Sequence, residues 1–210
     1  MAEKTLYLMR HGETDMNRQR RLQGQINCAL NENGLAEAKE TAKLLRNAGI
    51  SFTEVYSSPL SRAMDTAAAV SGGVPVIAEP LIMEMSFGRY EGVEYSSLGE
   101  ELWSFIHDPE NIPAPEGVET KDSITSRTGQ FLRRVISDGK EGNVLAVTHG
   151  IALRSMLWNL YPINERKNVW SMPIGNCVIY RCTVRDGAVT DIRRADELCT
   201  SVINDTSRVF

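Results

Sequence analysis

The stretch that most constrains this chain lies near its start, at residues 6–14. Four apolar residues, Leu-Tyr-Leu-Met, stop abruptly at Arg10, His11 and Gly12. A short apolar run that ends at a charge and a glycine predicts a buried β-strand, which carries Arg10 and His11 to its carboxyl end. Open α/β sheets bind their ligands at that end of the strands, so we expect a site there.

The same pattern returns late in the chain. Residues 143–148 form a second apolar run, which ends at His149 and Gly150 and passes into a helical pattern over 151–160. A glycine lets the backbone approach an anion closely, Arg10 offers a planar fork of donors, and a neutral imidazole can attack phosphorus or move a proton. Two histidines that leave two strands beside two glycines indicate one anion site rather than two unrelated core residues.

The composition fits one ordinary globular domain without a strong overall charge. The chain has 210 residues, of which 42% are hydrophobic and 24% are charged, and its net charge is −4. This balance provides no positive field to hold a polyanion, which argues against nucleic acid and membrane as partners. Any anion must therefore be held by a local cluster of cations.

Cysteine usage and the apolar runs predict the cellular compartment. The four cysteines form no C-x-x-C pair, which favours reduced thiols in a cytoplasmic protein over a disulfide framework. No apolar run approaches transmembrane length, and we expect no cleavable leader before the first strand. The sequence leaves open whether the chain forms a homodimer.

Helical and extended patterns alternate between the two histidines. In chain order we expect a polar loop over 15–33, a helix from 35 to Gly49, strands over 52–56 and 74–78, a helix over 123–137, and a hairpin of strands 176–184 and 188–194. Asn31 or Asn33 is the expected cap of the first helix. An alanine-rich helix follows Ser57-Ser58-Pro59, with a serine as its cap and the proline in its first turn. Arg62 then lies in that first turn, where the helix dipole favours an anion.

Residues 81–120 contain the candidate acid. Glu84 lies among apolar neighbours, where a lone acid is usually capped or salt-bridged, but where a desolvated carboxyl group has a raised pKa and can stay protonated near neutrality. From residue 91 to residue 119 there is no lysine or arginine, and three prolines break the chain. We interpret residues 85–120 as a cap-like excursion from the sheet, made of a helix and a stiff loop, which covers the site.

Taken together, these motifs resemble the histidine phosphatase superfamily in its phosphoglycerate mutase-like branch, with its broad-specificity phosphatases as the nearest group. The matching pieces are Arg10-His11-Gly12-Glu13-Thr14, Asn17, Arg21 with Gln23-Gly24, Ser57-Ser58-Pro59-Leu60-Ser61-Arg62-Ala63, Glu84 with Gly88, Glu91-Gly92, and Thr148-His149-Gly150. The resemblance implies an α/β three-layer sandwich with a mostly parallel sheet, helices on both faces and an antiparallel strand near one edge. It also implies that residues 1–210 form a single histidine phosphatase domain.

The resemblance implies a role for each candidate residue. His11 is the nucleophile that takes the phosphoryl group, and Glu84 donates a proton to the leaving group. Substrate binding falls to Arg10, Asn17, Gln23, Gly24, Arg62, His149 and Gly150. No metal or cofactor is expected, because two guanidinium groups and a second imidazole can stabilise the charge of a phosphoryl group in transfer. Asn27 and Ala29 replace an aspartate and a proline that the family often has, which leaves the geometry of that loop open.

The sequence favours hydrolysis of a small phosphorylated metabolite over mutase-type transfer. A mutase must retain a second anionic group while its bisphosphate intermediate turns, and the family's mutases have basic residues in a longer insertion for this purpose. Residues 91–119 have none, which predicts a substrate whose organic part is neutral or apolar. Arg20, Arg21 and Arg89 are the cations that could still reach the rim.

Two alternatives belong to other classes of protein. The first is a non-catalytic phosphoprotein-binding module, but both histidines and the acid are present. The second is a metallohydrolase built on His11, His149 and Asp15, but the chain has no H-E-x-x-H motif.

Overall fold

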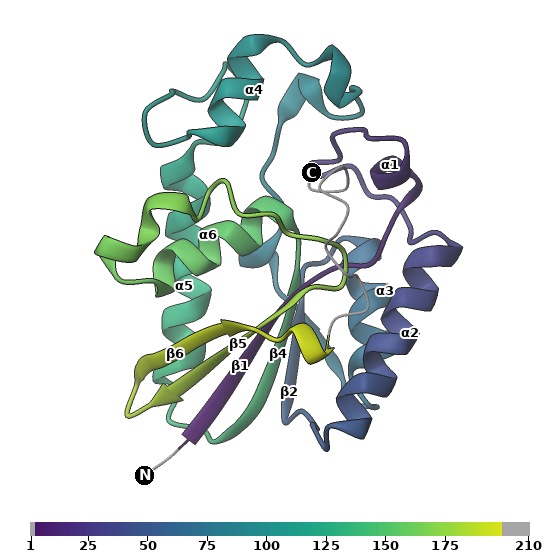
Figure 1. Ribbon diagram of the computed structural model, residues 1–210, viewed down its shortest axis with the longest axis vertical. Coiled ribbons are helices and arrows are strands. Elements are labelled where there is room, and N and C mark those ends of the chain that lie inside the picture. Colours follow the sequence, from purple (N-terminus) through teal and green to yellow (C-terminus); the bar gives the residue numbers. More distant parts are fainter. Residues whose placement is uncertain (1–2, 199–210) are drawn as a thin grey trace.

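The computed structural model describes residues 3–198, which form a six-stranded sheet with helices on both faces (Figure 1). The strands are β1 (Glu3–Arg10), β2 (Glu54–Ser57), β3 (Val76–Ala78), β4 (Gly142–Thr148), β5 (Ile179–Arg185) and β6 (Ala188–Arg194). Their order across the sheet is β3-β2-β4-β1-β5-β6. Strands β1 to β4 are parallel, whereas β5 is antiparallel to β1 and forms the predicted hairpin with β6. The predicted α/β architecture is confirmed.

Two pairs of helices form the outer layers and explain the apolar runs. The pairs are α2 (Glu32–Asn47) with α3 (Ser61–Val70), and α5 (Lys121–Ser137) with α6 (Gly150–Leu160). Along β1, Leu6 and Leu8 belong to the core beneath α5 and α6, while Tyr7 and Met9 belong to the core beneath α2 and α3. Both faces of the strand are buried, so it shows no polar alternation.

The pairing of β1 with β4 brings the two histidines together. In the parallel register Arg10 lies opposite Thr148, so His11 and His149 leave the sheet at the same level. The His11 backbone N–H donates to the Thr148 carbonyl at 2.9 Å. Because both strands end at this edge, side chains that are far apart in sequence meet at their carboxyl ends.

The ends of two helices test the predicted caps. Asn31 caps α2 through a hydrogen bond from the Gly34 N–H to its side chain, as predicted, and α2 ends at Asn47, shortly before Gly49. The predicted serine cap of α3 is wrong, because α3 begins at Ser61 after Leu60, whose side chain makes no capping bond. Arg62 nevertheless lies in the first turn.

The polar loop predicted over residues 15–33 contains one short helix, α1 (Asp15–Arg18). A capping box closes it, in which the Asn17 N–H donates to the Thr14 hydroxyl and the Asn17 side chain accepts from the Thr14 N–H. These two hydrogen bonds fix the position of Asn17 in the segment that follows β1 and His11.

Residues 79–120, which include the stretch 85–120 singled out in the sequence, lie beyond the carboxyl ends of the strands (Figure 1). This excursion consists of three short 3₁₀ helices, η1 (Pro80–Ile82), η2 (Gly88–Tyr90) and η3 (Tyr95–Ser97), followed by α4 (Glu100–His107). Phe87, Leu102 and Phe105 of this segment pack in an apolar cluster that also takes in Ile124 of α5 and Ala152 of α6. Two further 3₁₀ helices are η4 (Ile163–Asn168) and η5 (Asp196–Leu198).

Arg127 of α5 attaches this excursion to the sheet-bound part of the molecule. Its guanidinium donates to the carbonyls of Leu81, Met83 and Glu84 at 2.6–3.0 Å, and it pairs with Glu119 at 2.8 Å. The Arg127 side chain therefore fixes the backbone on both sides of Glu84 to α5. Within residues 3–198, no helix has both the length and the apolar character needed to traverse a bilayer.

Candidate active site

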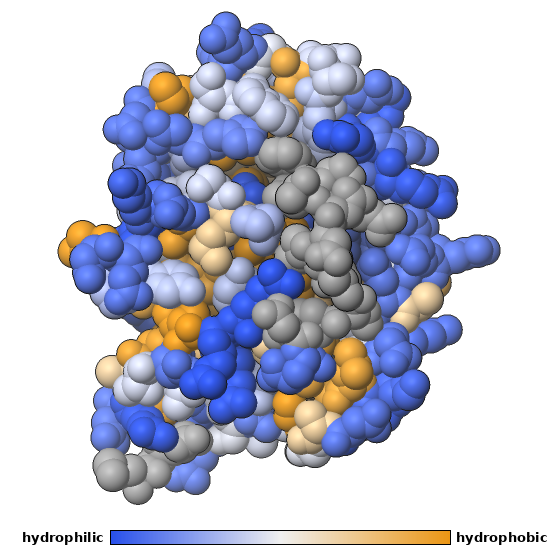
Figure 2. Space-filling view, viewed as in Figure 1, coloured by the Kyte–Doolittle hydropathy of each residue, from blue (hydrophilic) through white to orange (hydrophobic). Residues whose placement is uncertain are grey.

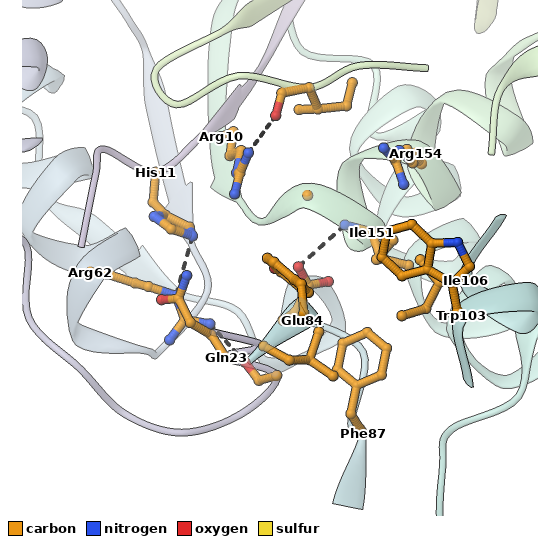
Figure 3. A pocket seen from close by; sticks show the side chains of 15 residues that line it. Arg10, His11, Gln23, Arg62, Glu84, Phe87, Trp103, Ile106, Ile151 and Arg154 are labelled. Carbon is orange, nitrogen blue, oxygen red and sulfur yellow. Dashed lines mark hydrogen bonds between the residues drawn. The ribbon is translucent and has the colours of Figure 1, made fainter. Parts of the chain in front are cut away.

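A cavity of about 50 Å³ lies at the carboxyl ends of β1 and β4, between the sheet and the excursion (Figure 3). The residues that line it are Arg10, His11, Leu22, Gln23, Gly24, Arg62, Glu84, Phe87, Tyr95, Trp103, Ile106, Gly150, Ile151, Arg154 and Ile174. Seven of the nine residues proposed from the sequence are in this set. The other two, Asn17 and His149, are not among the lining residues.

The hydrogen bonds of His11 define its tautomer. Its Nδ1 lies 2.7 Å from the Gly12 carbonyl, which can only accept, so Nδ1 carries the proton. Nε2 therefore keeps its lone pair and accepts from Nε of Arg62 at 3.2 Å. Burial, together with the charges of Arg62 and Arg10, lowers the pKa of His11 well below its usual value. The ring is thus neutral at neutral pH, the form that can act as a nucleophile.

Arg62 is a buried cation fixed by neutral acceptors. It is 1% exposed, and its terminal nitrogens donate to the carbonyls of Ile26 and Gly24 at 2.7 Å each. Gly24 has a φ of +51°, and a Cβ there would lie 2.3 Å from Oε1 of Glu91, so only glycine fits. The carbonyls orient the guanidinium without neutralising its charge, which remains available to an anion in the cavity.

Arg10 and His149 complete the cationic and imidazole side of the site. Arg10 ends β1 and donates to the Ile174 carbonyl. The His149 ring lies beside that of His11, with 5.1 Å between the ring centroids, and its Nε2 is 2.7 Å from the Ser58 hydroxyl. Its Nδ1 has no hydrogen-bond partner among residues 3–198. Burial, with the charge of Arg62, lowers the pKa of His149 well below its usual value, so this ring is also neutral at neutral pH.

Asn17 is linked to His11 through the side chain of Asn176. Its Oδ1 accepts from Nδ2 of Asn176 at 3.4 Å, and that same amide donates to the His11 carbonyl at 3.0 Å. Its own Nδ2 has no partner within the described residues. Within residues 3–198, Asn17 therefore acts on the His11 backbone only through Asn176, and it is not among the residues that line the cavity.

The carboxylate of Glu84 accepts hydrogen bonds from three backbone N–H groups. The residue is buried, but Oε1 accepts from the N–H groups of Met85 and Ala152, at 2.9 Å each, and Oε2 accepts from the N–H of Ile151 at 3.2 Å (Figure 3). Glu84 thus caps the N-terminus of α6 across 67 residues of sequence. Of the two settings that the sequence leaves open, the structure shows the capped one, and the capping groups are the N-terminal N–H groups of a distant helix, which the sequence does not identify.

Arg154 is the charged residue of the cavity lining that no sequence motif singles out. It is 4% exposed, and its Nε donates to the Met172 carbonyl at 2.9 Å. Burial, with the nearby charge of Arg10, lowers its pKa to about 10. The signal was present, because Arg154 is the one charged residue in the helix Gly150–Leu160 and lies four positions after Gly150, on the same helical face.

The three arginines proposed for the rim do not line the cavity. Arg21 pairs with Glu94 at 2.8 Å, Arg89 is exposed beside Tyr90, and Arg20 lines a neighbouring groove. The cavity nevertheless contains a third arginine, Arg154, which comes from α6 rather than from residues 91–119.

An apolar wall faces the ionic residues. Leu22, Phe87, Trp103 and Ile106 contribute to it. Tyr95 also lines the cavity, and burial raises its pKa to about 12, so its phenol stays protonated. Tyr95 and Trp103 also line a broad groove of about 740 Å³, which begins where the cavity ends.

The positive charge of the cavity lining comes from the guanidinium groups of Arg10, Arg62 and Arg154. Among the residues that the structure describes, no three histidine, cysteine, aspartate or glutamate side chains are placed to hold a metal ion. On the face of the molecule seen in Figure 2, hydrophilic residues predominate and the hydrophobic residues form separate groups.

Comparisons with known proteins agree with this geometry. A family model described as the histidine phosphatase superfamily, branch 1, matches residues 6–196. A probable phosphoglycerate mutase, GpmB, of Erwinia tasmaniensis is 33% identical over 184 residues, which cover 84% of this chain and 83% of that protein.

Solved structures of phosphatases have the same fold. A putative alpha-ribazole-5'-P phosphatase from Escherichia coli superposes with a TM-score of 0.78 at 26% identity, covering 91% of this chain and 95% of that one. A phosphoserine phosphatase from Entamoeba histolytica, solved in complex with phosphoserine, gives a TM-score of 0.77 at 25% identity and covers 90% of this chain and 96% of that one.

Proposed function

The chain belongs to the histidine phosphatase superfamily, branch 1, and we propose that it is a phosphomonoester hydrolase that needs no metal and forms a phosphohistidine on His11. The state of His11 is the observation that carries the proposal. Its Nδ1 proton is held by the Gly12 carbonyl, and its Nε2 lone pair meets Arg62 at the cavity. A buried neutral imidazole with two guanidinium groups beside it is suited to attack a phosphate ester.

In the first half-reaction, Nε2 of His11 attacks phosphorus and the bond to the ester oxygen breaks. Nε of Arg62 gives up its hydrogen bond to Nε2 of His11 and donates to the phosphoryl oxygens, to which Arg10 also donates. The Gly12 carbonyl then accepts from Nδ1–H of a phosphorylated, positively charged ring, and so stabilises it. The charge that builds on the equatorial oxygens is matched by cations already fixed in place.

Glu84 is the proposed proton carrier. In this role it acts as the carboxyl form while the phosphate ester is bound. The carboxyl group then gives its proton to the departing oxygen. In the second half-reaction the carboxylate takes a proton from water, the water oxygen attacks phosphorus, and the bond from phosphorus to His11 breaks.

Residues 85–120 are proposed to act as the cover of a single domain that spans residues 1–210. Phe87, Trp103 and Ile106 of this segment face the cavity, which supports a role in excluding water and contacting the organic part of the substrate.

Mutase-type transfer is the second candidate, and the 33% identity to a probable phosphoglycerate mutase is the observation that favours it. Arg154 provides one cation at the far side of the cavity, whereas a bisphosphate that turns must keep both a phosphate and a carboxylate bound there. We therefore expect 3-phosphoglycerate supplied with catalytic 2,3-bisphosphoglycerate to give free phosphate rather than the 2-isomer.

Trapping the phosphoenzyme tests the proposal. The wild-type protein is mixed with 4-nitrophenyl phosphate in the presence of a chelator, denatured in alkali, in which phosphohistidine survives, and mapped by peptide mass spectrometry. We expect phosphate on His11, and His11→Ala should lose the label and about 1,000-fold or more of the turnover. His107→Asn, outside the cavity, is the matched control. Full turnover by His11→Ala, or activity lost to the chelator, would contradict the proposal.

A further inference from the structure

Arg154 is a buried cation for which the described residues provide little compensation. Within residues 3–198 its one hydrogen bond runs from Nε to the Met172 carbonyl at 2.9 Å. No carboxylate in that part of the chain forms an ion pair with it. The two terminal nitrogens, which carry most of its donors, lie at a cavity that the same side chain lines.

The nearby acid does not neutralise this charge. Glu84 attracts Arg154 electrostatically, but its oxygens accept from the backbone N–H groups at the start of α6. Arg10, also at the cavity, repels Arg154. A charge that has left water costs free energy unless an opposite charge or good hydrogen bonds replace the solvent. An anion that arrives with a ligand would supply both.

The position of Arg154 indicates which part of a ligand it meets. In Figure 3, His11 and Arg154 lie on opposite sides of the cavity, with Glu84 below and between them. A phosphoryl group at His11 places its ester oxygen toward Glu84, so the organic part of the substrate extends toward Arg154. Along α6, Gly150 at the phosphate side and Arg154 are four residues apart, roughly 6 Å of helix rise, which is the length scale of a short-chain acid.

We propose that Arg154 is a specificity-determining residue that binds a carboxylate on the organic part of the substrate. This inference rests on the proposed hydrolase function and adds the substrate class, a carboxylated phosphomonoester. A guanidinium presents two parallel N–H donors, which match the two oxygens of a carboxylate. With one such cation on this side, the site suits a single carboxylate rather than a second phosphate.

Matched substrates test the inference. The substrates 3-phosphoglycerate and glycerol 3-phosphate differ in one carbon, a carboxylate in the first and a hydroxymethyl group in the second. We expect the wild-type protein to favour the acid in kcat/KM by about 10- to 100-fold, the effect of a charge-assisted hydrogen bond. Arg154→Met should remove most of that preference through KM, and Arg154→Lys should restore part of it. Arg46→Met, an exposed arginine of α2, is the control.

A binding measurement separates this inference from the proposed function. With the nucleophile removed by His11→Ala, calorimetry should show tighter binding of 3-phosphoglycerate than of glycerol 3-phosphate, and the added Arg154→Met change should abolish the difference. Equal kcat/KM for both substrates in the wild type, or a preference that survives in Arg154→Met, would overturn the role of Arg154 while the hydrolase stands. Failure to form phosphohistidine would overturn the hydrolase instead.

Discussion

The two ends of the cavity each contain a buried arginine, but the two guanidinium groups differ in their hydrogen bonds. Arg62, at the phosphate end, has both terminal nitrogens fixed by the carbonyls of Gly24 and Ile26. Arg154, at the far end, has only its Nε bonded, to the Met172 carbonyl, within the described residues. Backbone carbonyls from a loop therefore orient one cation, whereas the other keeps its terminal donors for a ligand.

This difference follows from how the two ends are built. The phosphate end is assembled from strand ends, where the register of β1 with β4 sets the positions of Arg10, His11 and His149. The far end combines α6 with residues 85–120, whose cavity-lining side chains are apolar or aromatic: Phe87, Tyr95, Trp103 and Ile106. A rigid end suits a phosphoryl group, which is common to all substrates, and a varied end suits the part by which substrates differ.

The substitution Arg62→Met should impair phosphate binding and catalysis at the phosphate end of the cavity. We expect kcat/KM to fall by about 1,000-fold, because the variant removes a cation both from the phosphoryl oxygens and from Nε2 of His11. The loss should be equal for 3-phosphoglycerate and glycerol 3-phosphate, in contrast to Arg154→Met. Steady-state assays of free phosphate measure both. A loss confined to the carboxylated substrate would mean that the two arginines share one role.

The phosphate end could be predicted from the sequence and the far end could not. Arg10 with His11 and His149 with Gly150 each follow an apolar run, and strand ends in a parallel sheet meet at one edge, so local pattern was enough. Arg62 was found through its place in a first helical turn. These inferences need only the periodicity of single elements.

Arg154 and the contacts of Glu84 depend on long-range packing. The Glu84 carboxylate meets α6 across 67 residues of sequence, and Arg154 faces the cavity because the chain around Met172 crosses beside it. No periodicity in the sequence shows which helix N-terminus an isolated glutamate will cap. A single arginine within an apolar helix was the available sign, and it indicates burial rather than a particular partner.

Glu84 lies between the two ends, and Glu84→Gln should separate proton transfer from binding. Glutamine cannot donate an acidic proton, so hydrolysis of an alkyl ester, which has a poor leaving group, should fall about 100-fold more than hydrolysis of 4-nitrophenyl phosphate. Paired kcat/KM measurements on glycerol 3-phosphate and the aryl ester give this ratio.

Glutamine also disturbs the cap of α6, and that effect needs its own control. Thermal unfolding of Glu84→Gln reports the loss of the cap, which acts on both substrates alike. An equal fall in kcat/KM on the alkyl and the aryl ester would contradict the role of Glu84 as proton donor and leave it as a capping residue of α6.

The smallest expected effect concerns stability and again contrasts the two ends. Burial holds the pKa values of His11 and His149 well below the usual 6.5, so between those values and 6.5 the unfolded chain binds protons that the native protein does not. The free energy of unfolding should therefore fall as the pH drops below about 6.5, by roughly 1.4 kcal/mol per pH unit for each histidine. Urea unfolding from pH 7.5 to pH 5.5 measures this slope. His149→Asn should flatten it more than His107→Asn, which removes an imidazole from α4 in the excursion. Equal slopes in the two variants would mean that the phosphate end does not hold its histidines neutral.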